Sequence, residues 1–281
     1  MVNLLIHSMD EEIEKIHAVF QSIDIDSFET EEEYLQQKRL TLDPFVFDSL
    51  KKLYSSYLKE QWNTKAIPYK SDKAIVIVER RCHSNLEFIL HNVSHFAPGY
   101  AIHIFCSDQN LSYIKLICGT QVNNIHIHSI FDTIGTPEEG KTKYNNILKT
   151  TEFWNFFKEE HILTIETDSY LLQHIPESIY EYDYVASGWP WLASEPGGGG
   201  LSYRKCSIMK KICELDKVLI DCPAQDAFAS NGIKILGGKY SHNFFTECNI
   251  LENATGTHQW WTYYHMDMSK DFIKHHLTLK L

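Results

Sequence analysis

The sequence has 281 residues, 43% of them hydrophobic and 22% charged, which is the composition of a globular protein with a sizeable core. The formal net charge of −11 argues against non-specific binding to nucleic acid or to an anionic membrane. No stretch approaches the roughly 20 apolar residues that a membrane span requires.

Residues 1–70 form an acidic segment with helix-like spacing. The start, MVNLLIHSMDEEIEKI, lacks the basic region and cleavage site of a signal peptide, and the seven cysteines are scattered without a C-x-x-C pair. Apolar residues recur every three or four positions after Asp43-Pro44, which is the expected helix start. We therefore expect a cytoplasmic protein with reduced thiols and a helical N-terminal extension that caps the main domain or forms a homodimer interface.

The pattern changes near Ser71, where we place the start of an α/β domain over residues 71–281. Short β-branched apolar runs alternate with helical spacing: KAIVIVERR, then NLEFILHNVSHF, AIHIFCS, NIHIHSI, TKYNNILKTTEFWNFF and HILTIETD. Such alternation predicts a Rossmann-like, mostly parallel sheet flanked by helices. Ligands of such sheets bind at the carboxyl ends of the strands, so the polar residues that end each run are the first site candidates.

The segment GTPEEGKT at 135–142 matches the phosphate-loop pattern G-x-x-x-x-G-K-S/T. In a phosphate-loop NTPase, Lys141 would reach the outer phosphates and the Thr142 hydroxyl would bind magnesium. Two features argue against a phosphate loop. The carboxylates of Glu138 and Glu139 would repel the phosphates, and Pro137 lacks the backbone N–H that the loop would donate to them. A surface turn that leads into a helix is the favoured interpretation, with an NTPase as the alternative.

The segment Glu166-Thr167-Asp168 ends the fourth apolar run. Carboxylates at positions i and i+2 of an extended chain point to the same side. At the carboxyl end of a strand they would jointly hold a hard divalent cation and, through it, a diphosphate. A salt-bridged or capping acidic turn is the alternative, because the motif alone is weak.

Several segments in a fixed order resemble the glycosyltransferase A-fold, and more closely a family of glycosyltransferase-like domains of unknown function. They are VIVERRCHSNLEFILHNVSHF at 76–96, IHIFCSDQN at 102–110, TEFW at 151–154, ILTIETDSYLL at 162–172, YDYVASGWPW at 182–191, GGGGLSYRKCSIM at 197–209, AQDAFA and GTHQWW. The resemblance covers roughly residues 72–265 and leaves out the first 70. It implies a metal-dependent glycosyltransferase that moves a sugar from a nucleotide-diphosphate donor to an acceptor hydroxyl of a glycan, protein or small molecule.

The resemblance also implies a metal site, for Mn²⁺ or Mg²⁺. Glu166-Thr167-Asp168 resembles the D-x-D element, with Asp168 as the first choice of direct ligand and Thr167 beside the donor. Glu166 departs from the pattern, since its longer side chain replaces the first Asp. His258 resembles the late histidine that completes the metal site in members of the fold.

Donor and acceptor residues follow from the same resemblance. Glu79, Arg80 and Arg81 end the first strand, where the nucleoside binds, and either arginine would pair with phosphate; surface solubility is their alternative role. Gly199 and Gly200 would let the backbone approach a bound sugar, or form a mobile loop.

Gln225-Asp226 resembles the acidic position that follows the glycine segment. In an inverting enzyme Asp226 would be the general base that deprotonates the acceptor; a helix N-cap is its alternative. Tryptophans 189, 191, 260 and 261 would stack on sugars or pack in the core, and His126 and His128 are expected to be packed. A non-catalytic carbohydrate- or nucleotide-binding relative also remains open, because Glu occupies the first D-x-D position.

Overall fold

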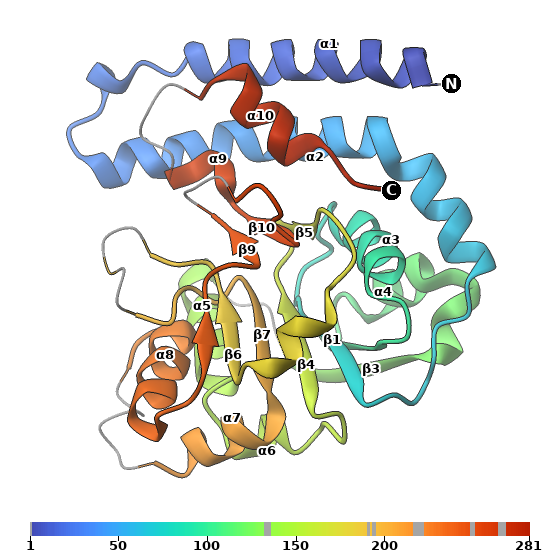
Figure 1. The fold of residues 1–281 in the computed structure, drawn as a ribbon, viewed down its shortest axis with the longest axis vertical. Coiled ribbons are helices and arrows are strands. Elements are labelled where there is room, and N and C mark those ends of the chain that lie inside the picture. The colour runs from blue at the N-terminus through green and yellow to red at the C-terminus, as the bar shows by residue number, and fades with distance from the viewer. Residues whose placement is uncertain are drawn as a thin grey trace.

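The computed structural model describes residues 2–131, 136–189, 192, 195–215, 222–247, 251–263 and 268–281. A seven-stranded sheet runs through its centre in the order β3-β2-β1-β4-β7-β6-β8 (Figure 1). The strands are β1 (Lys73–Val78), β2 (Ala101–Ser107), β3 (Ile125–Phe131), β4 (His161–Ile165), β6 (Tyr184–Ala186), β7 (Leu201–Lys205) and β8 (Tyr240–Ser241). Only the pairings of β7 with β4 and β6 are antiparallel. The predicted mixed, mostly parallel sheet is confirmed.

Both faces of the sheet are buried, which explains the continuous apolar runs. On β1, Ile75 and Ile77 enter one core cluster while Ala74 and Val76 enter the other. The first cluster is covered by α3 (Leu86–Phe96), α4 (Leu111–Cys118) and the 3₁₀ turn η2 (Gly119–Asn124). The second is covered by α5 (Pro137–Ile147), α6 (Thr151–Trp154), α7 (Cys206–Cys213) and α8 (Gln225–Leu236).

The helical pattern TKYNNILKTTEFWNFF is divided between α5 and α6. Thr150 separates the two helices, because its side chain accepts a hydrogen bond from the Phe153 amide and caps α6. The break lets Phe153 and Trp154 enter the core beneath the sheet.

Helices α1 (Val2–Gln21), α2 (Glu31–Thr64) and α10 (Lys270–Leu277) lie together across one end of the sheet (Figure 1). The short η1 (Ile25–Ser27) connects the first two. The helix start expected at Asp43-Pro44 is wrong, because α2 begins at Glu31 with a capping box between Thr30 and Glu33 and continues through Pro44. Fully buried Leu42 and Leu50 on either side hold the helix together where proline removes a hydrogen bond.

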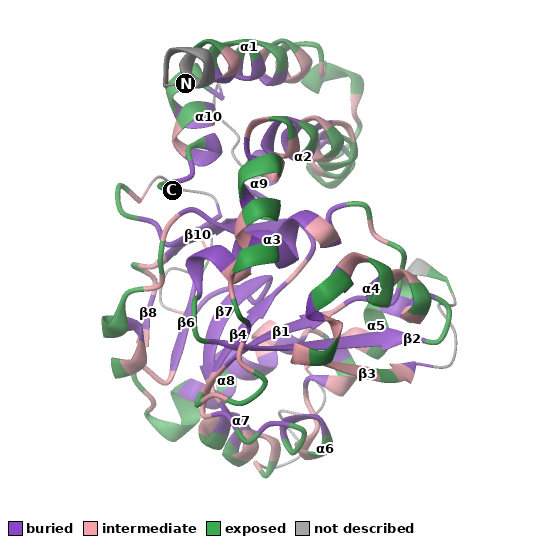
Figure 2. Cartoon of the chain, turned by 90° about the vertical axis from the view of Figure 1, so that its right-hand side faces the viewer, coloured by how far each residue is buried: buried purple, intermediate pink, exposed green. Residues whose placement is uncertain are grey.

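The N-terminal helices share a core with the sheet. Val46, Phe47 and Leu50 of α2 belong to the same buried cluster as Ile75 and Ile77 of β1. In Figure 2 the inward faces of the helices and the sheet are buried, while the outward faces of α1 and α2 are exposed. The apolar side of α2 is therefore covered by its own chain, and the homodimer stays a prediction.

A second, three-stranded sheet lies between the main sheet and α2 (Figure 1). Its order is β5 (Ser169–Leu171), β10 (Gly256–His258) and β9 (Phe245–Thr246), and it is followed by α9 (Trp260–Tyr263). The connection from β5 to β6 contains η3 (Glu177–Glu181). Among the described helices, none combines the length and apolar character needed to cross a membrane.

Candidate metal and donor site

The candidate site forms where β4, β7 and β10 meet. Glu166 follows β4 directly, and its amide donates to the Gly200 carbonyl at 2.9 Å, just before antiparallel β7 begins. His258 ends β10, which pairs with β5 so that His258 lies opposite Ser169. These pairings bring together residues that are far apart in the sequence.

Glu166, Asp168 and His258 each place a ligand atom within 4.8 Å of the others. His258 Nε2 and Asp168 Oδ1 form an ion pair and are 3.4 Å apart. Both atoms are buried, and neither has a well-formed hydrogen bond within the described part of the chain. Two buried polar atoms that face each other without other partners are what a site prepared for a cation presents.

The remaining atoms of the three side chains are held by neighbours. Asp168 Oδ2 accepts from Arg39 at 2.8 Å and from the side-chain Nε2 of Gln259, while Tyr144 donates to Glu166 at 2.7 Å. His258 Nδ1 lies 3.1 Å from Glu247 Oε1. A carboxylate at Nδ1 fixes the imidazole so that its Nε2 lone pair points into the cluster, as outer partners of metal-bound histidines do.

The charges of the cluster depend on one another. Burial lowers the pKa of His258, but the Glu247 and Asp168 carboxylates outweigh it and raise the pKa well above the ordinary value. Burial likewise raises the pKa of Asp168, yet His258 and Arg39 bring it well below its usual range. Burial and the Asp168 charge raise the pKa of Glu166. A divalent cation would take over the role of the imidazolium proton between Asp168 and His258.

The donor set fits a divalent ion. One imidazole nitrogen and two carboxylates suit Mn²⁺, and the carboxylates suit Mg²⁺. Asp168 Oδ1 and His258 Nε2 are the atoms that would hold it, with Glu166 as the third candidate.

Gly199 and Gly200 are buried, and their lack of a side chain leaves space for His258 and Gln225. A Cβ atom on Gly200 would lie 2.2 Å from His258 Nε2, and one on Gly199 would lie 2.3 Å from Gln225 Nε2. The glycines therefore pack against side chains of the site.

Gln225 and Asp226 open α8 beside this glycine segment. The alternative N-cap role of Asp226 is wrong, because Ala224 is the N-cap and Asp226 lies in the first turn, accepting from the Ala227 backbone amide at 2.7 Å. Gln225 accepts from buried Arg204, which fixes the start of α8 beneath Gly199. This leaves the role of general base as the prediction for Asp226.

The residues after β1 form a compact ion pair. Arg81 donates to both oxygens of Glu79, at 2.9 and 2.8 Å, and Thr167 donates to Glu79 at 3.3 Å. The structure places Arg80 in the interior, 5.5 Å from the Phe131 ring, so surface solubility does not describe it. Glu79, Arg81 and Thr167 thus lie together next to the metal cluster.

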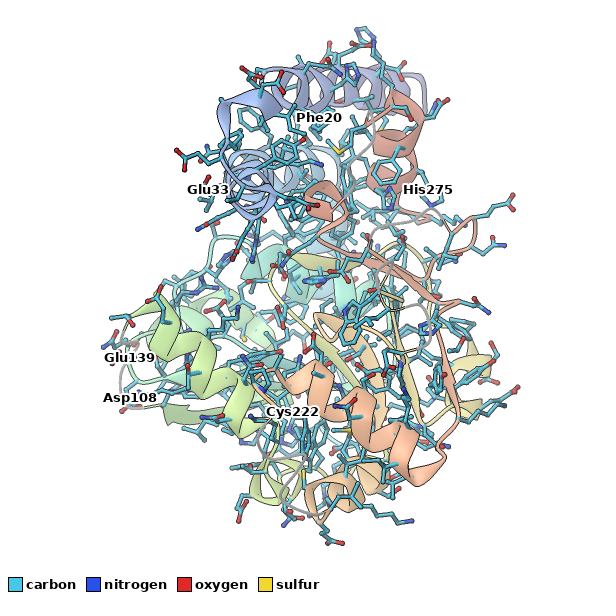
Figure 3. The ribbon with its side chains drawn as sticks, turned by 90° about the vertical axis from the view of Figure 1, so that its left-hand side faces the viewer. Phe20, Glu33, Asp108, Glu139, Cys222 and His275 are labelled. Atoms are coloured by element: carbon cyan, nitrogen blue, oxygen red, sulfur yellow. The ribbon has the colours of Figure 1, made fainter. Side chains whose placement is uncertain are left out.

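The phosphate-loop pattern does not form a cradle over residues 136–142. Thr136 caps α5, whose first turn is Pro137 to Gly140, and the Gly140 amide donates to the Thr136 carbonyl. Glu139 completes the capping box and lies at the outer edge of the molecule (Figure 3). These amides are used inside the helix, so they do not surround a phosphate; Gly135 lies outside the described residues.

A family model described as "Protein of unknown function (DUF5672)" matches residues 129–274, which is more than half of the chain. The chain belongs to this family. No curated protein matches it. The DUF5672 region contains Glu166, Asp168, Glu247 and His258 but excludes the N-terminal helices and β1.

A second cluster of possible metal ligands contains His103, His126 and Glu159. The His103 and His126 rings are stacked, with centroids 4.2 Å apart and planes inclined by 14°. An ion must lie near the plane of each imidazole that binds it, and nearly parallel planes at this spacing prevent this. His128 bonds to His103 at 3.1 Å, so the prediction that His126 and His128 are packed agrees with this geometry.

The tryptophans are divided between core and surface. Trp260 and Trp261 are fully buried, so they are not stacking platforms for a sugar. Trp189 is partly buried, and a Cβ on Gly198 would lie 2.9 Å from its Nε1. Trp191 lies outside the described residues.

Sequence reasoning missed Arg39, Tyr144, Glu247 and Gln259. Gln259 follows His258 directly in GTHQWW, so its place in the sequence could have marked it as a neighbour of the site. Arg39 lies outside the DUF5672 region, 129 residues from its partner Asp168, and has no motif around it. Only the packing of α2 over the strand ends reveals its position.

Asp43 of α2 provides a pH-dependent prediction. Burial and the Asp168 charge raise its pKa from 3.8 to about 6, although Arg39 and Lys51 act in the opposite direction. The folded state therefore holds this proton more tightly than the unfolded state, so the contribution of Asp43 to stability is highest below pH 3.8, falls as the pH rises from 3.8 through about 6, and stays lower above that. Without metal, we expect Asp43→Asn to stabilise the protein by about 2 kcal/mol at pH 8 and to be neutral near pH 4.

Urea unfolding of the wild type and the variant at pH 4, 6 and 8 measures this difference. Asp48→Asn, at an exposed position of the same helix, is the control and should change stability little at any of these pH values. A stability difference for Asp43→Asn that is the same at pH 4 and pH 8 would contradict the prediction.

Proposed function

We propose that the protein is a metal-dependent glycosyltransferase, which transfers a sugar from a nucleotide-diphosphate donor to an acceptor hydroxyl. The supporting observation is the buried pair Asp168 Oδ1 and His258 Nε2, which face each other at 3.4 Å at the carboxyl end of β4 and make no well-formed hydrogen bond among the described residues. The sequence resemblance to the glycosyltransferase A-fold supports it independently. The mostly parallel sheet is compatible with that fold.

The chain's own residues would divide the work. Asp168 and His258 would hold the ion, Glu247 would orient His258, and Tyr144 would orient Glu166. When bound, the ion would neutralise the charge that develops on the departing diphosphate. Asp226, at the start of α8 beside Gly199, would accept the proton of the acceptor hydroxyl.

The first test is a thermal-shift series with UDP- and GDP-sugars, each with and without Mn²⁺. A ligand at 100 times its dissociation constant stabilises the folded state by about 2.7 kcal/mol, so a sugar nucleotide should raise Tm by several degrees only when Mn²⁺ is present. Donor hydrolysis or transfer is then assayed with the ligand that binds. No response to any sugar nucleotide with Mn²⁺ would overturn the proposal.

The same series separates the alternatives. Lys141→Ala, at an exposed position of α5, should leave metal-dependent binding of sugar nucleotides unchanged. An ATPase or GTPase activity that disappears in Lys141→Ala would instead identify a phosphate-loop enzyme. Donor binding without turnover under any condition would identify a non-catalytic relative.

A further inference from the structure

The N-terminal helix α2 reaches the candidate metal site through Arg39. Arg39 Nη2 lies 2.8 Å from Asp168 Oδ2, and 49% of the arginine side chain is exposed. The bond uses the oxygen of Asp168 that does not face His258, since Oδ1 has that position. Arg39 and a cation at Oδ1 are therefore compatible neighbours on the same carboxylate.

The position of Arg39 is fixed by packing around α2. Fully buried Phe47 makes edge-on contacts with Tyr170 and Trp261, each with ring centroids 5.9 Å apart. Both aromatic residues lie within three positions of a candidate metal ligand. A second connection runs from Lys51 to Asn85 at 2.9 Å, and from Asn85 to the Thr167 carbonyl at 3.2 Å. The helix is thus connected to the Glu166–Asp168 turn at Thr167 and, just after the turn, at Tyr170.

The guanidinium has donors left for an anion. Arginine carries five N–H groups, arranged in a planar fork that matches phosphate. Half of the Arg39 side chain is in contact with solvent next to the metal cluster, where a metal-bound diphosphate would arrive. Charge-assisted, two-pronged contacts of this kind are the strong ones in phosphate recognition.

The other arginines near the strand ends are engaged elsewhere. Arg81 is held by both oxygens of Glu79. Arg80 packs on Phe131 and against Gly140 of α5. Arg204 is fully buried and donates to Gln225 and Ser202. Arg81 is 59% exposed but uses both Nε and Nη2 on Glu79, whereas Arg39 uses Nη2 on Asp168 and so keeps more donors for a ligand that enters from solvent.

We propose that Arg39 binds the diphosphate of the donor, so that α2 completes the substrate site of the DUF5672 region. This inference rests on the proposed function, because it assigns a residue to the same donor. It gives the N-terminal helices a part in catalysis although neither the family match nor the sequence resemblance includes them.

Calorimetric titration tests the proposal with three probes: Mn²⁺ alone, uridine, and UDP or GDP in the presence of saturating Mn²⁺. Because Arg39 also holds Asp168 Oδ2, Arg39→Ala should lower Mn²⁺ affinity to some extent, but it should lower diphosphate affinity at saturating Mn²⁺ by at least about tenfold more. Arg39→Lys keeps the positive charge but lacks the planar, two-pronged guanidinium, so we expect a loss of diphosphate affinity between those of the wild type and Arg39→Ala. Lys59→Ala, an exposed position on the same helix that pairs with Glu87, is the matched control and should bind like the wild type.

The outcomes distinguish failure of this inference from failure of the proposed function. If the wild type binds neither diphosphate with Mn²⁺, the proposed function fails, and Arg39 loses its role with it. If the wild type binds and Arg39→Ala binds equally well, only the inference is overturned. Equal losses of Mn²⁺ and diphosphate affinity in both Arg39 variants would also overturn it, because Arg39 would then act solely by positioning Asp168.

Discussion

Replacing Asp168 with Asn is expected to abolish metal-dependent donor binding and turnover. Outer-shell changes at metal sites cost about 10- to 100-fold in affinity, and loss of a direct ligand should cost at least the upper end of that range. Asp168 Oδ1 lies 3.4 Å from His258 Nε2 and is the carboxylate oxygen that would meet the ion, so the change removes the charge that the ion would neutralise. The rise in Tm that Mn²⁺ produces in the wild type should disappear in the variant.

The control for this experiment is the second cluster of possible ligands. Glu159→Gln removes a buried carboxylate that lies 3.6 Å from His103, so it tests whether Mn²⁺ binds there instead. We expect Glu159→Gln to keep the full Mn²⁺ response. The assignment fails if Asp168→Asn retains the response, or if Glu159→Gln loses it while remaining folded by circular dichroism.

The sheet and part of the site could be predicted because their signals are local. Each buried strand is a run of apolar residues that ends in polar ones, and parallel strands bring those ends to one edge. Glu166 and Asp168 are two positions apart, so their proximity follows from the strand itself. The pairing of His258 with them was expected only through the family resemblance, and the structure brings the three together.

Long-range partners left no such signal. Arg39 and Glu247 reach the cluster through packing between elements that are distant in the sequence, and neither lies in a recognisable motif. The helix start expected at Asp43-Pro44 was wrong because proline usually marks a first turn, while here buried apolar residues on both sides carry the helix through it. Tertiary packing thus outweighed a local rule at Pro44 and was the only source of the contacts of Arg39 and Glu247.

Gly200→Ala should weaken metal binding although it replaces none of the candidate ligands. The new Cβ would lie 2.2 Å from Nε2 and 2.4 Å from Cε1 of His258, so the imidazole must move. Gly200 cannot retreat easily, because its carbonyl accepts from the Glu166 amide at 2.9 Å and from the Ser169 hydroxyl at 3.1 Å. Displacing the ring takes Nε2 away from Asp168 and should lower Mn²⁺ affinity by about 10- to 100-fold, with about 1–3 kcal/mol lost in stability from overpacking.

A double-mutant cycle with His258→Ala isolates this mechanism. In the His258→Ala background the space above Gly200 is open, so Gly200→Ala should cost much less stability than in the wild type, while Mn²⁺ binding stays weak in both. Gly238→Ala, where the nearest atoms lie at 3.3 to 3.4 Å, is the control and should keep Mn²⁺ affinity unchanged. Equal stability costs of Gly200→Ala in the two backgrounds would show that contact with His258 is not the cause. Normal Mn²⁺ affinity in Gly200→Ala itself would show that His258 is not a metal ligand, because displacing a ligand lowers the affinity.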